Sequence, residues 1–134
     1  MSADTSHGAP LQATAQARRS RAAIVRQPRA PMSLEEIDVA APRDDEVRVR
    51  LVAAGICHTD LVCRDGFPVP MPIVLGHEGA GVVESVGAAV KTLAVGDHVL
   101  LSFNACGICP NCASHEPAYC HHFLGLNFGG LGRV

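Results

Sequence analysis

The sequence predicts a small, mainly β domain, a barrel or sandwich, followed by a lobe that a metal ion holds together. Short apolar runs with the period of two that is typical of strands are separated by glycine and proline. Four of the six cysteines fall within residues 106–120, where this alternation has stopped. With 134 residues, 48% of them hydrophobic and 18% charged, the chain is expected to fold as one soluble domain.

The first twenty residues, 1–20, are predicted to form a disordered basic leader, and residues 21–134 the folded domain. The leader is rich in Ala, Ser, Thr and Gln without apolar periodicity. Arginines gather near its end, and such a tail can contact nucleic acid or a membrane. Because no aromatic residues are interleaved with them, a solvated extension is favoured. The absence of a secretory or membrane-spanning run favours the cytoplasm over an organelle transit peptide.

Taken in order, the first expected elements are strands at 21–26 and 34–39, joined by the turn-rich QPRAPM as a hairpin. The clearest strand covers 46–55, where valine and leucine alternate with arginine. A short helical turn through 61–65 follows, with Thr59 or Asp60 as its cap.

After the proline-rich FPVPMP, the segments PIVLGHE, GAGVVESVG and VKTLAVGDHVLLSF indicate further short strands. Glycine and proline separate them, as in a small all-β barrel or sandwich. The alternation stops beyond Phe103, so the next segment needs another source of order.

That source is predicted to be a structural zinc ion. The segment CGICPNCASHEPAYC offers four thiolates in a stretch without a strand or helix pattern, and the proposed ligands are Cys106, Cys109, Cys112 and Cys120. Backbone N–H groups are expected to bond the thiolates. With four protein ligands no position remains for substrate. Disulfides, an iron–sulfur cluster and a nucleic-acid-binding zinc ribbon are weaker alternatives, the last because residues 106–120 contain no Lys or Arg.

A second group of potential ligands begins at the end of the clearest strand. Cys57 and His58 follow it, and His77 and Glu78 lie between two glycines. A thiolate, an imidazole and a carboxylate are a mixed zinc-ligand set. On spacing alone, a structural role for these residues stays the more common reading.

The segments GICHTDL, GHEGAGVVESVG, GDHVLLSF and CGICPNC resemble, in order and spacing, the GroES-like catalytic domain of zinc-dependent medium-chain alcohol dehydrogenases. The similarity runs from about residue 22 to 130 and is closest to the aryl-alcohol (benzyl alcohol) branch, with geraniol-type enzymes similar. It implies a partly open β-barrel with an irregular structural-zinc lobe.

The resemblance implies a role for each residue of the second group. Cys57 and His77 would be ligands of the catalytic zinc, and Glu78 would lie close enough to exchange onto it. Asp60 would orient the imidazole of His77, and Thr59 would receive the proton of the substrate alcohol. His58 would contact the pyrophosphate of NAD. The parent enzyme would pass a hydride from alcohol to NAD and release an aldehyde.

The chain departs from the family pattern in three places. The family's third catalytic-zinc ligand, a second cysteine, would lie beyond this chain, and Cys63 is predicted to be a buried free thiol instead. Val62 stands where many members carry a relay histidine. No G-x-G-x-x-G fingerprint follows a strand, so the Rossmann domain is expected to be absent and the chain inactive alone.

The sequence therefore favours the catalytic-domain portion of an NAD-dependent alcohol dehydrogenase acting on primary aryl or allylic alcohols. Its partners would be a small alcohol or aldehyde, without nucleic acid or membrane, and the parent would be a homo-oligomer. The alternatives are a non-catalytic zinc-binding fragment, a zinc-ribbon-like nucleic-acid-binding module and a co-chaperonin, the last disfavoured because it needs neither zinc set.

Overall fold

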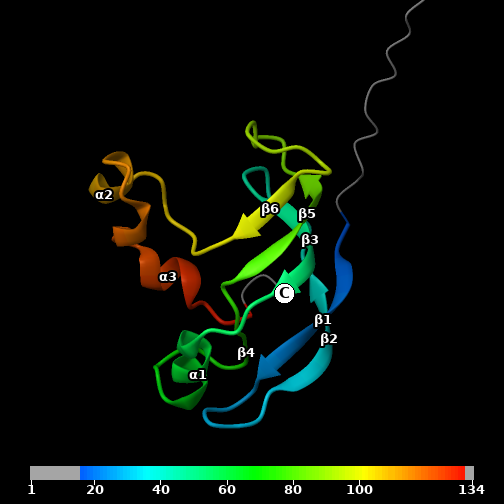
Figure 1. Ribbon diagram of the computed structural model, residues 1–134, viewed down its shortest axis with the longest axis vertical. Coiled ribbons are helices and arrows are strands. Elements are labelled where there is room, and N and C mark those ends of the chain that lie inside the picture. The colour runs from blue at the N-terminus through cyan, green and yellow to red at the C-terminus, as the bar shows by residue number, and fades with distance from the viewer. Residues whose placement is uncertain (1–15, 132–134) are drawn as a thin grey trace, which may run out of the picture.

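The computed structural model describes residues 16–131, whose strands form two three-stranded sheets with helical segments beside them (Figure 1). One sheet has the order β2-β1-β4, from Ser33–Val39, Arg18–Val25 and Ile73–Val74. The other has the order β3-β5-β6, from Val47–Ala54, Gly79–Val86 and His98–Leu101. The two sheets do not close into a barrel within the described residues. None of the helices in residues 16–131 is long and apolar enough to cross a membrane.

The predicted hairpin is confirmed by β1 and β2, which pair antiparallel from Arg18 opposite Val39 to Ile24 opposite Ser33. The strand starts at Arg18, three residues before the predicted start of folded structure. Arg19 forms an ion pair with Glu36 across this hairpin, so part of the basic cluster is folded and paired. Residues 1–15 of the predicted leader lie outside the described residues, and the domain boundary stays a prediction.

Strand β3 lies at the edge of its sheet and pairs antiparallel with β5 only. Its first valines, Val47 and Val49, are half-buried as the alternation predicts. Leu51, expected on the same buried face, is 53% exposed. The alternation therefore locates the strand correctly but not its burial, because Arg48 is half-buried like its two neighbours and residues 50–54 are all exposed.

Helix α1 spans His58–Asp65 and begins earlier than the predicted turn. Neither Thr59 nor Asp60 is its N-cap, so that prediction is wrong. Cys57 occupies the cap position, and its backbone N–H donates to Asp60 Oδ2 over 2.8 Å. A carboxylate in the first turn of a helix bonds the otherwise unpaired N–H groups there, which explains why the helix extends back to residue 58.

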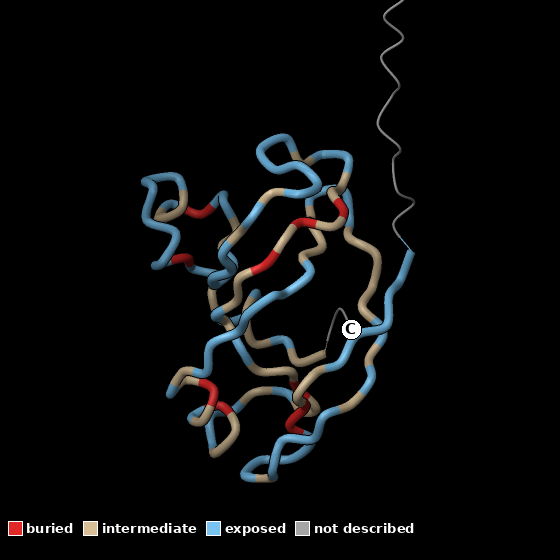
Figure 2. The backbone as a smooth tube through the Cα atoms, turned by 45° about the vertical axis from the view of Figure 1, so that its right-hand side comes forward, coloured by how far each residue is buried: buried red, intermediate tan, exposed pale blue. Residues whose placement is uncertain are grey.

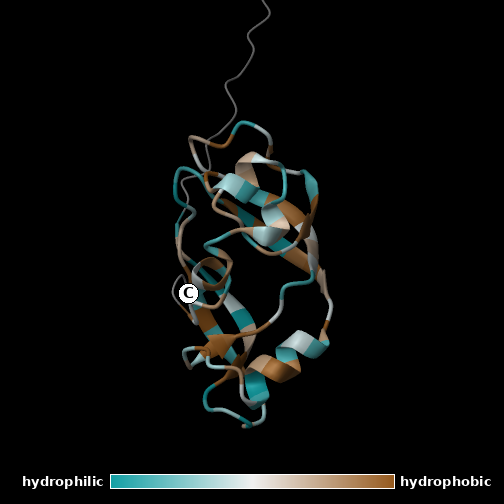
Figure 3. Cartoon of the chain, turned by 90° about the vertical axis from the view of Figure 1, so that its left-hand side faces the viewer, coloured by the Kyte–Doolittle hydropathy of each residue, from teal (hydrophilic) through white to brown (hydrophobic). Residues whose placement is uncertain are grey.

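The most deeply buried hydrophobic side chains lie on β1, β4 and β5, and the buried stretch of β5 stands apart from that of β1 and β4 (Figure 2). Ile24, Val25, Ile73 and Val83 are almost completely buried. Hydrophobic residues follow the strands and alternate there with hydrophilic ones (Figure 3). The pairing of β1 with β4, which sets Val25 opposite Ile73, brings three of these side chains into one cluster.

The cysteine-rich lobe projects from the end of β6 (Figure 1). It contains three short helical segments, α2 Pro110–Ala113, η1 Pro117–Tyr119 and α3 Phe123–Asn127. The segment 106–120, whose sequence shows no helix pattern, thus contains α2 and η1 as short single turns. Proline at the first position of each favours a single turn, because proline fixes φ and needs no N–H partner there.

Candidate metal centres

The four lobe cysteines form the first group of potential metal ligands. The sulfur atoms of Cys106, Cys109, Cys112 and Cys120 all lie within 4.8 Å of one another. Sγ–Sγ distances are 3.5 Å for Cys109–Cys112 and 3.9 Å for Cys106–Cys112. Sulfurs bound tetrahedrally at ~2.3 Å from Zn²⁺ would be about 3.8 Å apart, whereas a disulfide needs ~2.05 Å. The donor set fits zinc, and all six cysteines are free thiols.

Backbone N–H groups point at these sulfurs, as the sequence predicts. The N–H of Cys109 donates to Cys106 Sγ over 3.3 Å, and the N–H of Cys106 donates to Cys120 Sγ over 3.4 Å. Backbone hydrogen bonds from Cys112 and His121 lower the pKa of the Cys109 thiol to about 6, against the opposing effect of burial. Burial and the hydrogen bond with Cys109 raise the pKa of the Cys112 thiol to about 12, so without a metal ion the negative charge is favoured on Cys109 and not on Cys112.

A second group lies where the loop after β3 meets the loop before β5. Cys57, His77 and Glu78 each offer one ligand atom, and these atoms lie within 4.8 Å of one another. Gly55 pairs with this loop, its N–H donating to the backbone oxygen of Glu78 over 2.8 Å. A Cβ at residue 55 would come within 2.2 Å of Glu78 Oε2, so any other residue there would force that carboxylate to move from its position beside His77.

Asp60 and Thr59 surround this group. Asp60, 5% exposed, places Oδ1 3.4 Å from His77 Nδ1, while Nε2 of the same imidazole lies 3.8 Å from Glu78 Oε1. A carboxylate at Nδ1 favours the tautomer whose Nε2 lone pair is free for a metal. The Thr59 hydroxyl lies 3.6 Å from Cys57 Sγ. The site residues predicted on α1 and before β5 are therefore brought together.

The remaining predicted positions lie on α1. His58 is exposed in its first turn, and Val62 is 43% exposed. Cys63 is 3% exposed and belongs to neither ligand group in the described residues. Burial, reinforced by the charge of Asp60, raises the pKa of the Cys63 thiol, in agreement with a buried, unreactive cysteine.

An aromatic stack, which no sequence signal indicated, connects the two ligand groups. Phe103 lies parallel to the imidazole of His77, with ring centroids 4.6 Å apart. Its other neighbour is Phe123 of α3, at 4.9 Å. No periodic pattern in the sequence predicts this contact, because Phe103 follows β6 and Phe123 lies twenty residues later, after the last cysteine. The lobe therefore packs directly against one ligand of the second group.

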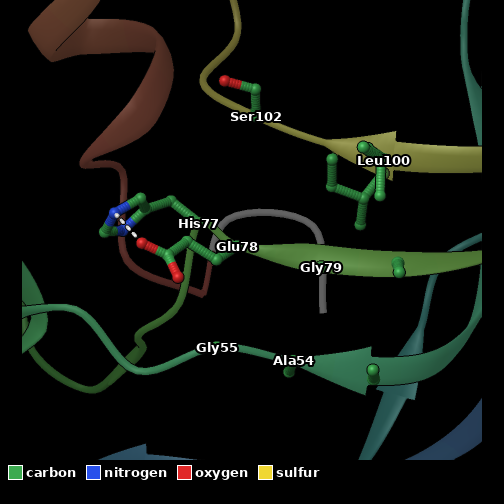
Figure 4. Close-up of a pocket in the computed structure, with 10 residues that line it drawn as sticks. Ala54, Gly55, His77, Glu78, Gly79, Leu100 and Ser102 are labelled. Atoms are coloured by element: carbon green, nitrogen blue, oxygen red, sulfur yellow. Dashed lines mark ion pairs between the residues drawn. The ribbon is translucent and has the colours of Figure 1, made fainter.

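A cleft of about 590 Å³ opens beside His77 and Glu78 (Figure 4). Its walls come from the ends of β3, β5 and β6, and small or apolar residues line most of it: Ala53, Ala54, Gly79, Ala80, Leu100 and Leu101. Ser102 adds a hydroxyl on the same side of the cleft as His77. The arrangement can hold an apolar small molecule with its polar end toward the ligand group.

Comparison with known proteins identifies relatives of the chain. Residues 43–134 match the family model described as alcohol dehydrogenase GroES-like domain. A geraniol dehydrogenase from Castellaniella defragrans is 56% identical over 115 residues, which cover 86% of this chain and 31% of the relative. An alcohol dehydrogenase 1 from Tanacetum cinerariifolium is 44% identical over 120 residues, which cover 85% of this chain and 32% of that relative.

Solved structures similar to this chain also come from alcohol dehydrogenases. An alcohol dehydrogenase zinc-binding domain protein from Burkholderia ambifaria superimposes with a TM-score of 0.84 at 58% identity, covering 87% of this chain and 32% of its own. The benzyl alcohol dehydrogenase of Acinetobacter calcoaceticus superimposes with a TM-score of 0.81 at 47% identity, and the match covers 84% of this chain and 31% of that enzyme. The predicted GroES-like fold is confirmed, and the chain spans about a third of the length of these relatives.

Proposed function

Because the chain belongs to the family of alcohol dehydrogenase GroES-like domains, we propose that it is the zinc-binding catalytic portion of an NAD-dependent alcohol dehydrogenase. The substrates we propose are primary aryl or allylic alcohols, which the parent enzyme oxidises to aldehydes. Relatives named for geraniol and for benzyl alcohol support this substrate class. The apolar lining of the cleft beside His77 is compatible with such a substrate.

The observation that carries the proposal is the convergence of Cys57 with His77 and Glu78, of which the last two line that cleft. Cys57 and His77 would hold the catalytic zinc, with Glu78 within reach of the same position. When bound there, zinc supplies a Lewis acid that lowers the pKa of an alcohol. The lobe cysteines would hold a second zinc whose four protein ligands leave no position for substrate, so its role is structural.

The chain's own residues have distinct tasks in this proposal. The Asp60 carboxylate, 3.4 Å from His77 Nδ1, would orient the imidazole and favour the tautomer that can bind a metal through Nε2. The Thr59 hydroxyl, beside Cys57 Sγ, takes the proton of the alcohol and passes it on. His58, exposed on the first turn of α1, would contact the pyrophosphate of NAD.

The chain alone is proposed to hold zinc without turning over alcohol. Its 134 residues contain no G-x-G-x-x-G fingerprint after a strand, so the nicotinamide cofactor lacks its usual binding crevice. We further propose that the parent acts in the cytoplasm as a homo-oligomer. These proposals concern a protein about three times as long as the chain, as judged from the relatives.

A non-catalytic zinc-binding role is the second candidate, because the lobe site is complete with four sulfurs whereas the other group offers three ligands. The nucleic-acid-binding alternative is weaker in the structure. Arg19 pairs with Glu36 and Arg26 pairs with Glu35, so these basic residues are partly neutralised on the hairpin itself.

Zinc analysis and alcohol oxidation test the proposal together. We expect two zinc ions per chain, one in Cys57→Ser, and oxidation of benzyl alcohol with NAD by the longer protein that carries this domain. That activity should be lost in Cys57→Ser and kept in the control Cys63→Ala, whose thiol lies outside both ligand groups. One zinc ion and no turnover in the longer protein would favour the non-catalytic alternative.

A further inference from the structure

A second cleft, of about 530 Å³, lies away from both ligand groups, between the start of β1 and the middle of β3 and β5. Three arginines line it: Arg18 from β1, and Arg48 and Arg50 from β3. A single carboxylate, that of Glu84 on β5, faces all three. The four side chains therefore carry two positive charges in excess.

The pairings with Glu84 are unequal. Arg18 donates to both carboxylate oxygens, at 3.0 and 3.1 Å, in the two-point geometry that satisfies a carboxylate. Nε of Arg48 and Nε of Arg50 each lie 3.7 Å from Glu84, beyond hydrogen-bond distance. Two of the three guanidinium groups thus feel the charge of Glu84 without being hydrogen-bonded to it.

Arg48 is the most enclosed of the three, with a side chain that is 14% exposed. One of its terminal nitrogens donates to the backbone oxygen of Gln16 over 2.6 Å. Its Nε is buried and has no hydrogen-bond partner among the described residues. A buried donor without an acceptor is costly, so the described residues leave the hydrogen-bonding capacity of this guanidinium group incompletely satisfied.

The rest of the cleft is apolar. Val82 shares a face of the sheet with Glu84, because side chains two apart on a strand point the same way, and Val95 comes from the loop before β6. The register sets Arg50 directly opposite Val82. Charged donors therefore meet an apolar wall in one cavity.

We propose that this cleft is a binding site for a small phosphate monoester. Its dianionic phosphate would match the two excess charges and bond the guanidinium groups of Arg48 and Arg50, and its carbon skeleton would lie against Val82 and Val95. Planar guanidinium groups suit phosphate oxygens because they donate in pairs. The site is independent of the metal centres and of the activity proposed above.

Phenyl phosphate is the probe, titrated into the zinc-loaded chain at constant ionic strength and followed by calorimetry and by backbone NMR shifts. We expect saturable binding, with the largest shifts at residues 48–50 and 82–84. Phenyl sulfate, of similar shape but with one negative charge, should bind more weakly. Shifts confined to Cys57 and His77 would place the phosphate at the metal centre and overturn the proposal.

Two substitutions give opposite expected results. Arg50→Gln, at a side chain 58% exposed, should weaken phenyl phosphate binding by about two- to fivefold, since partly exposed charge pairs have effects of that order. Glu84→Gln removes the internal competitor and should tighten binding by a similar factor. The control Arg19→Gln, outside the cleft, should leave affinity unchanged. Equal affinity in wild type, Arg50→Gln and Glu84→Gln would refute the site, as would tighter binding in Arg50→Gln.

Discussion

Replacing Cys120 by serine removes one of the four sulfurs of the lobe and, with it, the acceptor of the Cys106 N–H. The lobe has little else to order it, because Cys109 and Cys120 are its only buried residues among those described in 104–131. Structural zinc binding contributes about 10–16 kcal/mol in small zinc domains, or about 2.5–4 kcal/mol for each of four ligands. The loss should therefore weaken zinc binding by about 10²- to 10³-fold.

The assay is a competition titration of the lobe zinc against a chromophoric chelator, with hydrogen exchange measured over residues 104–131. Cys120→Ser should release its zinc at correspondingly lower chelator concentration and exchange its lobe amides faster. Cys63→Ala is the matched control, since it removes a buried thiol that belongs to neither group. Wild-type zinc affinity in Cys120→Ser, or an equal loss in Cys63→Ala, would refute the assignment of the four sulfurs as ligands.

Three further outcomes are expected. Asp60→Asn should weaken zinc binding at the His77 group by about 10- to 100-fold, measured by the same competition, while the lobe zinc is unaffected. Ile24→Ala should lower the free energy of unfolding by about 2–5 kcal/mol in urea titrations, because Ile24 is 1% exposed; a loss below that of Ile24→Val would contradict the core assignment. Arg26 lowers the pKa of Glu35 from 4.5 to about 2, so this pair stabilises the fold above pH 4.5 and the contribution disappears as pH falls toward 2. In Glu35→Gln the free energy of unfolding should fall less steeply between pH 4.5 and pH 2 than in wild type, as measured by unfolding curves at each pH. An unchanged pH dependence would count against a stabilising role for the pair.

Local patterns determined much of this fold. The hairpin of β1 and β2 and the strand at 47–54 follow from alternation and from turn residues between them, which act over a few positions. Burial was less predictable, because it depends on neighbours in space. Leu51 is exposed although it is apolar, because burial requires another part of the protein to cover that face of the sheet, and alternation carries no information about what covers it.

In the ligand groups, too, contacts between residues close in sequence were predictable and contacts between distant residues were not. The spacing of the four lobe cysteines anticipates their cluster, because ligands close in sequence need only a few turns to converge. Cys57 and His77 are twenty residues apart, and their proximity came from the family resemblance rather than from spacing. The cap at Cys57 was missed because cysteine is not a typical capping residue, and the stack of Phe103 on His77 joins segments without any shared pattern.

The stack of Phe103 between His77 and Phe123 bears on the order in which the two zinc ions are taken up. A zinc ion bound to the lobe cysteines would order α3, and Phe123 of α3 would then hold Phe103 against the His77 imidazole. Less entropy would therefore be lost when that imidazole binds the other ion. The first ion to arrive therefore raises affinity for the other, and by linkage the effect is mutual. Loading of the two centres is expected to be cooperative, with occupancy of the His77 group following that of the lobe.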